Sequence, residues 1–208
     1  IKQYQEGLKF ELTDPSGHAN SYMAMSDAYK GLEDYPNAME AYRKFLELNK
    51  DVSANDYAGL GTLAMRYGRS LAVDENNTEL TDEEKAAKKQ AQIEAFKQAD
   101  QIYADLIEKF PTVKAYGLYQ RGMVNSNIDA DMSQGLAKPY FEEVINILTQ
   151  EEELDAQGKR YLETSYRYLM SYNYQVMKDN KAALECAQKI LEIKPDDEGI
   201  KQVVETLS

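Results

Sequence analysis

The chain alternates stretches of helical hydrophobic spacing with short polar breaks. From Asn20 to Tyr29, apolar and small residues recur every three or four positions, which predicts a helix. Residues 31–36 interrupt the pattern with glycine and proline, and Ala38 and Phe45 then lie on the apolar stripe of a second predicted helix. Two helices joined by a short turn cannot bury both apolar faces alone, so we expect the pair to stack on neighbouring pairs.

The second of these helices is repeated near the end of the chain. When Asp34 is aligned with Asp179, Ala38 falls on Ala183 and the later apolar positions keep their spacing. A repeated apolar face indicates that each copy presents the same packing surface to a neighbour. Looser copies complete four predicted helix pairs, at residues 19–52, 54–112, 114–148 and 159–197, with a remnant helix at 1–13 and a capping helix at 198–208.

The second pair carries an insertion, residues 68–92, inside its hairpin. Thr81 followed by Glu84 has the form of a capping box and predicts the start of a helix. The first turns of that helix carry alanine as their apolar residue, so we expect them to lean on Tyr67 and Leu71 of an equally lengthened first helix. The insertion is either an arm that contacts a partner or an ornamental hairpin at an exposed turn.

The pattern resembles the tetratricopeptide repeat, whose unit of about 34 residues is a helix pair with small residues where the helices meet. The resemblance covers roughly residues 19–197, and Lys50 stands where the family has proline. It implies an all-α, right-handed solenoid of antiparallel helix pairs with one lengthened helical hairpin, forming a single domain over residues 1–208. In the first unit it rests on Tyr22, Met25, Ser26, Tyr29, Tyr35, Ala38 and Tyr42.

The resemblance also implies a concave groove lined by the first helix of each pair. Tyrosine and methionine are good contact residues in such a groove, although the tyrosines could equally fill and cap the helical stack. Because the register aims Tyr168 and Tyr172 into the groove, we expect their replacement to affect binding more than stability. The groove positions carried over are Met23, Asp27, Thr62, Tyr119, Gln120, Met123, Tyr168 and Tyr172.

One subtype of the family can be tested on the sequence. Chaperone-binding members clamp a terminal carboxylate with cationic and amide side chains on these first helices. The matching positions carry no cation, so a chaperone-tail ligand is not expected. They are Met23, Asp27, Gly59, Tyr116 and Gln120.

Composition narrows the function classes. The 208 residues are 43 % hydrophobic with few prolines and glycines, which is typical of a folded helical protein. The net charge of −12 argues against nucleic acid as a partner, and no apolar run approaches the roughly 20 residues that span a bilayer. The single cysteine excludes an internal disulfide and a multi-cysteine zinc site.

Candidate catalytic or metal-binding groups are few. His18 is the one histidine and stands in a turn, and Cys186 lies on a predicted helix as a packed thiol. Asp129 and Asp131 imitate the start of a calcium loop, but the glycine comes one residue late and Tyr140 stands where a closing glutamate is needed. We therefore expect no enzyme, no cofactor and no metal site.

The sequence thus predicts a non-catalytic module that binds an extended peptide or a protein surface. The alternative is an accessory glycan- or nutrient-binding protein of a bacterial envelope uptake system, in which tyrosines stack on sugar rings. The Tyr-rich, irregularly lengthened repeats resemble tetratricopeptide-repeat proteins of Bacteroidetes, many of which are exported, and this resemblance favours the periplasm or the outer-membrane face. The partner and the oligomeric state are not predicted.

Overall fold

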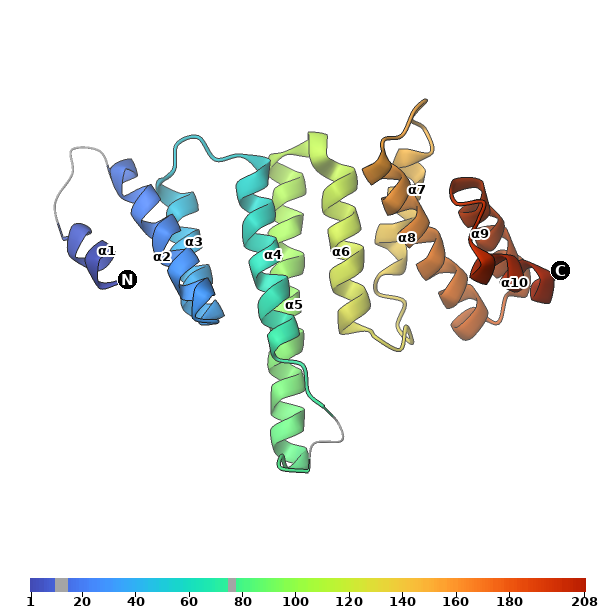
Figure 1. Cartoon of the computed structure of the whole chain (residues 1–208), viewed down its shortest axis with the longest axis horizontal. Helices are drawn as coiled ribbons and strands as arrows, with labels where there is room; N and C mark the ends of the chain where they lie inside the picture. Colours follow the sequence, from blue (N-terminus) through green and yellow to red (C-terminus); the bar gives the residue numbers. More distant parts are fainter. Residues whose placement is uncertain (10–14, 75–77) are drawn as a thin grey trace. The chain divides into compact units, whose positions relative to one another are not determined.

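The computed structural model describes residues 1–9, 15–74 and 78–208, and within these ranges every regular element is a helix (Figure 1). The prediction of an all-α fold of paired helices is confirmed. The chain forms two compact units, residues 1–110 and 111–208. The single array of four pairs over residues 1–208 stays a prediction.

The first unit consists of two helix pairs preceded by two short helical elements. Helices α3, α4 and α5 each start at a side chain that caps them, whereas α2 does not. Asp34 accepts a hydrogen bond from the Asn37 backbone N–H, and Ser53 and Asp56 form a capping box. Residues 10–13 of the predicted N-terminal helix lie outside the described residues. The elements are α1 (Lys2–Gly7), η1 (Pro15–His18), α2 (Ala19–Gly31), α3 (Tyr35–Leu48), α4 (Ala54–Ser70) and α5 (Asp82–Lys109).

Helices α4 and α5 approach closely because glycines of α4 receive aromatic rings of α5. A Cβ atom at Gly61 would lie 2.6 Å from the ring of Tyr103, and one at Gly68 would lie 2.6 Å from the ring of Phe96. Both rings are buried, Tyr103 completely. Ala99 of α5 is fully buried as well, and so are the alanines at the corresponding repeat positions, Ala38 of α3 in this unit and Ala137 and Ala183 in the second unit.

The insertion differs from the prediction in one respect. Helix α4, the first helix of the second pair, ends at Ser70 and so is not lengthened to match α5. The Tyr67 ring, which was expected to support the insertion, stacks on Tyr35 of α3 at a centroid distance of 6.1 Å. The predicted capping box at Thr81 is confirmed, and α5 extends past the end of α4 (Figure 1). The residues that follow α4 include the β-branched Val73, a weak helix former, whereas α5 begins with strong ones.

The first turns of α5 stand almost free of the rest of the unit. Residues 82–91 are exposed except for the half-buried Lys85, and the Gln92 amide donates a hydrogen bond to the Gly68 carbonyl at 3.1 Å, where the arm meets α4. Residues 75–77, from the predicted tip of the arm, lie outside the described residues.

The second unit repeats the same construction. The Phe141 ring lies over Gly122, where a Cβ atom would come within 2.6 Å of the ring, and Ile200 of the last helix packs on Ala187 and Ile190. Its elements are η2 (Pro111–Val113), α6 (Lys114–Ile128), α7 (Lys138–Leu148), α8 (Ala156–Tyr172), the π-helical turn η3 (Asn173–Met177), α9 (Asn180–Ile193) and α10 (Glu198–Leu207).

Two sets of polar interactions stabilise turns and helix contacts in this unit. The buried Asp129 carboxylate accepts backbone N–H bonds from Gln134 and Leu136, so the segment that imitated a calcium loop is a turn closed by its own side chain. Arg167 of α8 bridges Glu163 and Asp197, and Asp197 also caps the N-terminus of α10. Arg167 therefore ties α8 to the start of α10.

Candidate functional site

Three of the groove residues predicted from the sequence line one cavity of the first unit. The cavity, here named the α2–α4 cavity, has a volume of about 280 Å³ and lies between the first helices of the two pairs. Met23 and Asp27 come from α2, and Thr62 comes from α4. Their neighbours in the lining are Ser26, Lys30, Tyr42, Gly59, Leu63 and Arg66.

The α2–α4 cavity combines charge with a buried phenol. Lys30 and Arg66 bring positive charge, and Asp27 pairs with Lys30 at 2.5 Å. The Tyr42 hydroxyl would clash with a Cβ atom at Gly59, so the absence of a side chain there makes room for this phenol. Burial, together with Asp56 and then Asp27, raises the pKa of Tyr42 to about 12, and the hydroxyl stays a neutral hydrogen-bonding group.

Tyr119 of the second unit lies in the core. Its ring stacks on Tyr161 of α8 at a centroid distance of 4.1 Å and meets Phe141 edge-on at 6.5 Å. Tyr119 and Tyr161 are both buried. The sequence register placed Tyr119 on the groove face, whereas the structure places it between α6, α7 and α8 because Tyr161 supplies an aromatic partner across the helix pair.

Tyr168 and Tyr172 are half-buried and pack against the preceding helix pair. Their rings stack at 6.3 Å, Tyr168 also meets Phe141 at 4.9 Å, and Tyr172 lies over Gly135, whose φ is +65°. Burial first, and then the nearby Asp129, raises the pKa of Tyr168 to about 12. These two phenols therefore contribute to packing, and their place in a binding groove stays a prediction.

The remaining two predicted groove residues, Gln120 and Met123, lie half-buried on α6. They share that helix with Tyr119. The structure thus brings Met23, Asp27 and Thr62 together in one cavity and places Tyr119 in the core of the second unit.

A cavity that the sequence did not indicate lies between α8 and α10, with a volume of about 390 Å³. In this α8–α10 cavity, the described lining residues are all uncharged. Tyr174 is 50 % exposed, and the π-helical turn η3 that carries it ends at Lys178 in the left-handed conformation. The lining residues are Met170, Ser171, Tyr174, Gln175, Gly199, Gln202, Val203, Thr206 and Leu207.

The apolar face of α10 was a signal for this cavity. Ile200, Val203, Val204 and Leu207 share one helical face, which is typical of a terminal capping helix. Ile200 is buried, whereas Val203 and Leu207 are half-buried and line the cavity.

In the described part of the chain, the His, Cys, Asp and Glu side chains form no group of three or more that could hold a metal ion. Cys186 is half-buried, burial raises the pKa of its thiol, and the Asn173 amide approaches the sulfur at 3.9 Å. No helix among residues 1–9, 15–74 and 78–208 has the length and apolar content that crossing a bilayer requires.

Comparison with known families adds one finding. A family model described as tetratricopeptide repeat matches residues 19–52, which span α2 and α3, and residues 164–197, which include most of α8 and all of α9. Both segments are similar to the tetratricopeptide repeat. Tetratricopeptide repeats generally mediate protein–protein interactions, and the family is typically a non-catalytic scaffold. A search of curated proteins finds no match to the chain.

Proposed function

We propose that this chain is a non-catalytic interaction module that binds an extended peptide or a protein surface through one cavity in each of its two units. In the second unit the binding site is the α8–α10 cavity, and in the first unit it is the α2–α4 cavity. Each cavity contacts the partner within its own unit.

The observation that carries this proposal is the chemistry of the α8–α10 cavity. The chain is 29 % charged, yet the described residues of this cavity are uncharged and include Tyr174 and Met170. The centres of protein–protein interfaces are depleted of charged residues and enriched in tyrosine and methionine. A half-exposed tyrosine beside a cavity is also the kind of residue that forms a binding hot spot.

The α2–α4 cavity supports the same proposal in the first unit. It lies in a matched repeat segment on one side, and it was predicted from Met23, Asp27 and Thr62. Its charges suit a partner segment that brings both polar and charged groups, because Asp27, Lys30 and Arg66 line the same opening.

The proposal is tested by capturing partners from an extract of the source cells, purifying the partner that is enriched, and titrating it against variants by calorimetry. Tyr174→Ala should weaken binding at least about tenfold, as loss of a hot-spot residue does. Met177→Ala is the matched control, because Met177 is 57 % exposed in the same turn and is not among the cavity residues. Equal affinity of Tyr174→Ala and the unaltered protein would contradict the assignment of this cavity.

A glycan is the second candidate ligand, and one observation favours it. Tyr174 offers an exposed ring beside the uncharged hydrogen-bonding groups of Gln175, Gln202 and Thr206, which is the combination that neutral sugars need. Titration of the same variants with neutral oligosaccharides separates the two readings. Saturable binding that Tyr174→Ala abolishes would favour the envelope nutrient-binding function over a protein partner.

A further inference from the structure

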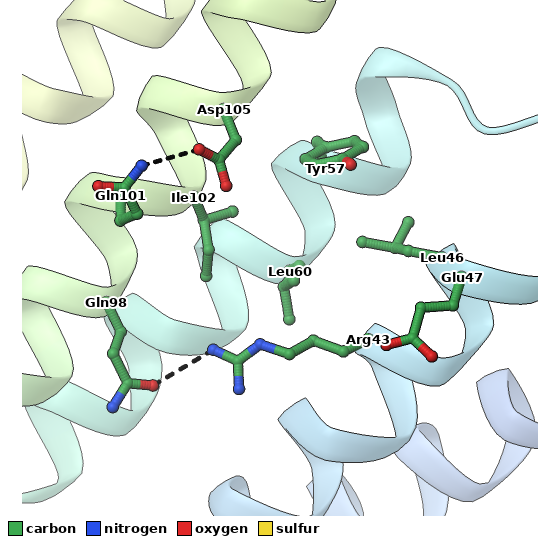
Figure 2. Close-up of a pocket in the computed structure, with 9 residues that line it drawn as sticks. All are labelled: Arg43, Leu46, Glu47, Tyr57, Leu60, Gln98, Gln101, Ile102 and Asp105. Carbon is green, nitrogen blue, oxygen red and sulfur yellow. Dashed lines mark hydrogen bonds between the residues drawn. The ribbon is translucent and has the colours of Figure 1, made fainter.

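The first unit has a second cavity, the α3–α5 cavity, which lies between the second helices of its two pairs and is also lined by Tyr57 and Leu60 of α4 (Figure 2). Its volume is about 430 Å³. Leu60 and Ile102 are its buried apolar floor, and Arg43 extends from α3 across the opening toward α5. Nothing in the proposed function uses this cavity, because its lining is distinct from that of the α2–α4 cavity.

One helix provides a polar wall. Gln98, Gln101 and Asp105 are spaced three and four residues apart on α5, so they share one face of the helix, and Figure 2 shows them one above another beside the floor. The axial distance from Gln98 to Asp105 is about 10 Å at the usual rise of an α-helix. The wall is therefore an elongated edge with its carboxylate at one end.

Opposite charges mark the two ends of the cavity. At one end, the Arg43 guanidinium donates a hydrogen bond to the Gln98 side-chain oxygen at 3.3 Å, and among the described residues this neutral amide is its one acceptor. At the other end, the Asp105 carboxylate accepts a hydrogen bond from the Gln101 side-chain nitrogen at 2.8 Å. Arg43 and Asp105 are held by neutral amides, so each keeps most of its charge for another partner. The third charged residue of the lining, Glu47, pairs with Lys44 at 2.7 Å.

These contacts also fix which atoms of the two amides remain for a ligand. Because the Gln98 oxygen faces the guanidinium, its Nε2 group keeps its donors, and because the Gln101 nitrogen faces the carboxylate, its Oε1 keeps its lone pairs. The wall thus offers one donor and one acceptor between the charged ends. A peptide backbone presents the complementary carbonyl and N–H groups.

We propose that the α3–α5 cavity binds an extended peptide segment that carries an acidic and a basic side chain three residues apart. The acidic side chain pairs with Arg43, the basic one pairs with Asp105, and the backbone between them bonds to Gln98 and Gln101. The spacing follows from the geometry if the segment takes the polyproline II conformation, in which three residues make one turn and advance about 9 Å, so that both charged side chains point toward the same wall. An apolar residue between the charged ones covers Leu60.

The probe is a synthetic peptide, acetyl-Gly-Glu-Leu-Ala-Arg-Gly-amide, titrated to millimolar concentration into the full chain labelled with nitrogen-15. A peptide with glutamine in place of both charged residues is the comparison. We expect chemical-shift changes that saturate and that map to α3 and α5, with the charged peptide binding more tightly at low ionic strength. The absence of saturable shifts, or shifts that map to α2 and α4 around Met23 and Thr62, would overturn the proposal.

Substitutions then separate specific contacts from the overall charge. Arg43→Gln should weaken the charged peptide about three- to tenfold and leave the neutral peptide unchanged. Lys97→Gln is the control, because it removes the same charge from an exposed position of α5, where Lys97 pairs with Glu94 at 2.9 Å and neither residue lines the cavity. Equal losses in the two variants would show a nonspecific charge effect and refute the site.

The backbone contact has its own test. Gln98→Met keeps the length of the side chain and removes its amide, so it should weaken the charged and the neutral peptides by similar factors. If Gln98→Met leaves both affinities unchanged, the amide wall does not bind the backbone and the proposal fails. Gln98 and Arg43 are exposed, so these variants keep the core of the unit intact. Tyr174→Ala, which tests the proposed function, should leave this binding unchanged.

Discussion

The contact between Gly61 and Tyr103 allows the packing of α4 on α5 to be tested by a substitution that adds a single methyl group. In Gly61→Ala the added Cβ would lie 2.6, 2.7 and 3.0 Å from three ring atoms of Tyr103. That ring is completely buried, so it cannot swing into solvent, and the two helices must separate or the ring must move within the core. Overpacking of this kind costs about 1–3 kcal/mol of the free energy of unfolding.

Gly31→Ala is the matched control, since it makes the same chemical change at the end of α2, where a Cβ atom meets nothing within 4 Å. Alanine is the better helix former, so this variant should gain up to about 1 kcal/mol. Urea unfolding followed by circular dichroism should therefore move the two midpoints in opposite directions. If Gly61→Ala is as stable as Gly31→Ala, α4 and α5 do not approach as described and the hairpin register is wrong.

Two further predictions concern the second unit. Tyr168→Ala combined with Tyr172→Ala should lower the free energy of unfolding by about 2–4 kcal/mol in urea titrations, because the two rings stack on each other and Tyr168 packs on Phe141. Unchanged stability would show that the rings are not needed for packing and would favour the predicted groove assignment. The pKa of Asp197 is held below its ordinary value of 3.8, first by a backbone N–H of α10 and then by Arg167. The ionised Asp197 carboxylate stabilises the fold fully above pH 3.8, and this stabilisation is lost as the pH falls through the lower folded-state pKa. The free energy of unfolding of Asp197→Asn should therefore depend less on pH below about pH 4 than that of the unaltered protein. An unchanged pH dependence would show that the carboxylate is not coupled to folding.

The elements of the fold that could be predicted are those set by local sequence. The apolar spacing around Ala38 and Ala183 repeats because each copy packs in the same way, and both alanines are fully buried. The capping box at Thr81 is formed by residues three positions apart, so it was visible in the sequence. The end of α4 was missed because a helix boundary depends on what the last turns contact, and Tyr67 contacts α3.

The tyrosines show where a register carried along the chain stops being sufficient. A helical position fixes the direction of a side chain only roughly, and a large ring at the border between core and groove turns toward whichever partner is present. For Tyr119 that partner is Tyr161, which is 42 residues later in the chain, at a ring distance of 4.1 Å. No periodicity within α6 contains this information.

The α8–α10 cavity was missed for a different physical reason. A π-helical turn takes one residue more than an α-helical turn, so residues after Tyr172 are rotated relative to the face that a regular helix would give them. Regular helical spacing puts Tyr174 on a different side of the helix from Tyr168 and Tyr172. That spacing could not show that Tyr174 lies beside α10. Since the turn also ends in a left-handed residue, Lys178, this local irregularity positions an exposed aromatic ring next to an uncharged cavity. Such irregular turns are frequent at functional sites. Here the π-helical turn carries Tyr174 and Gln175, which line the cavity that the proposed binding requires.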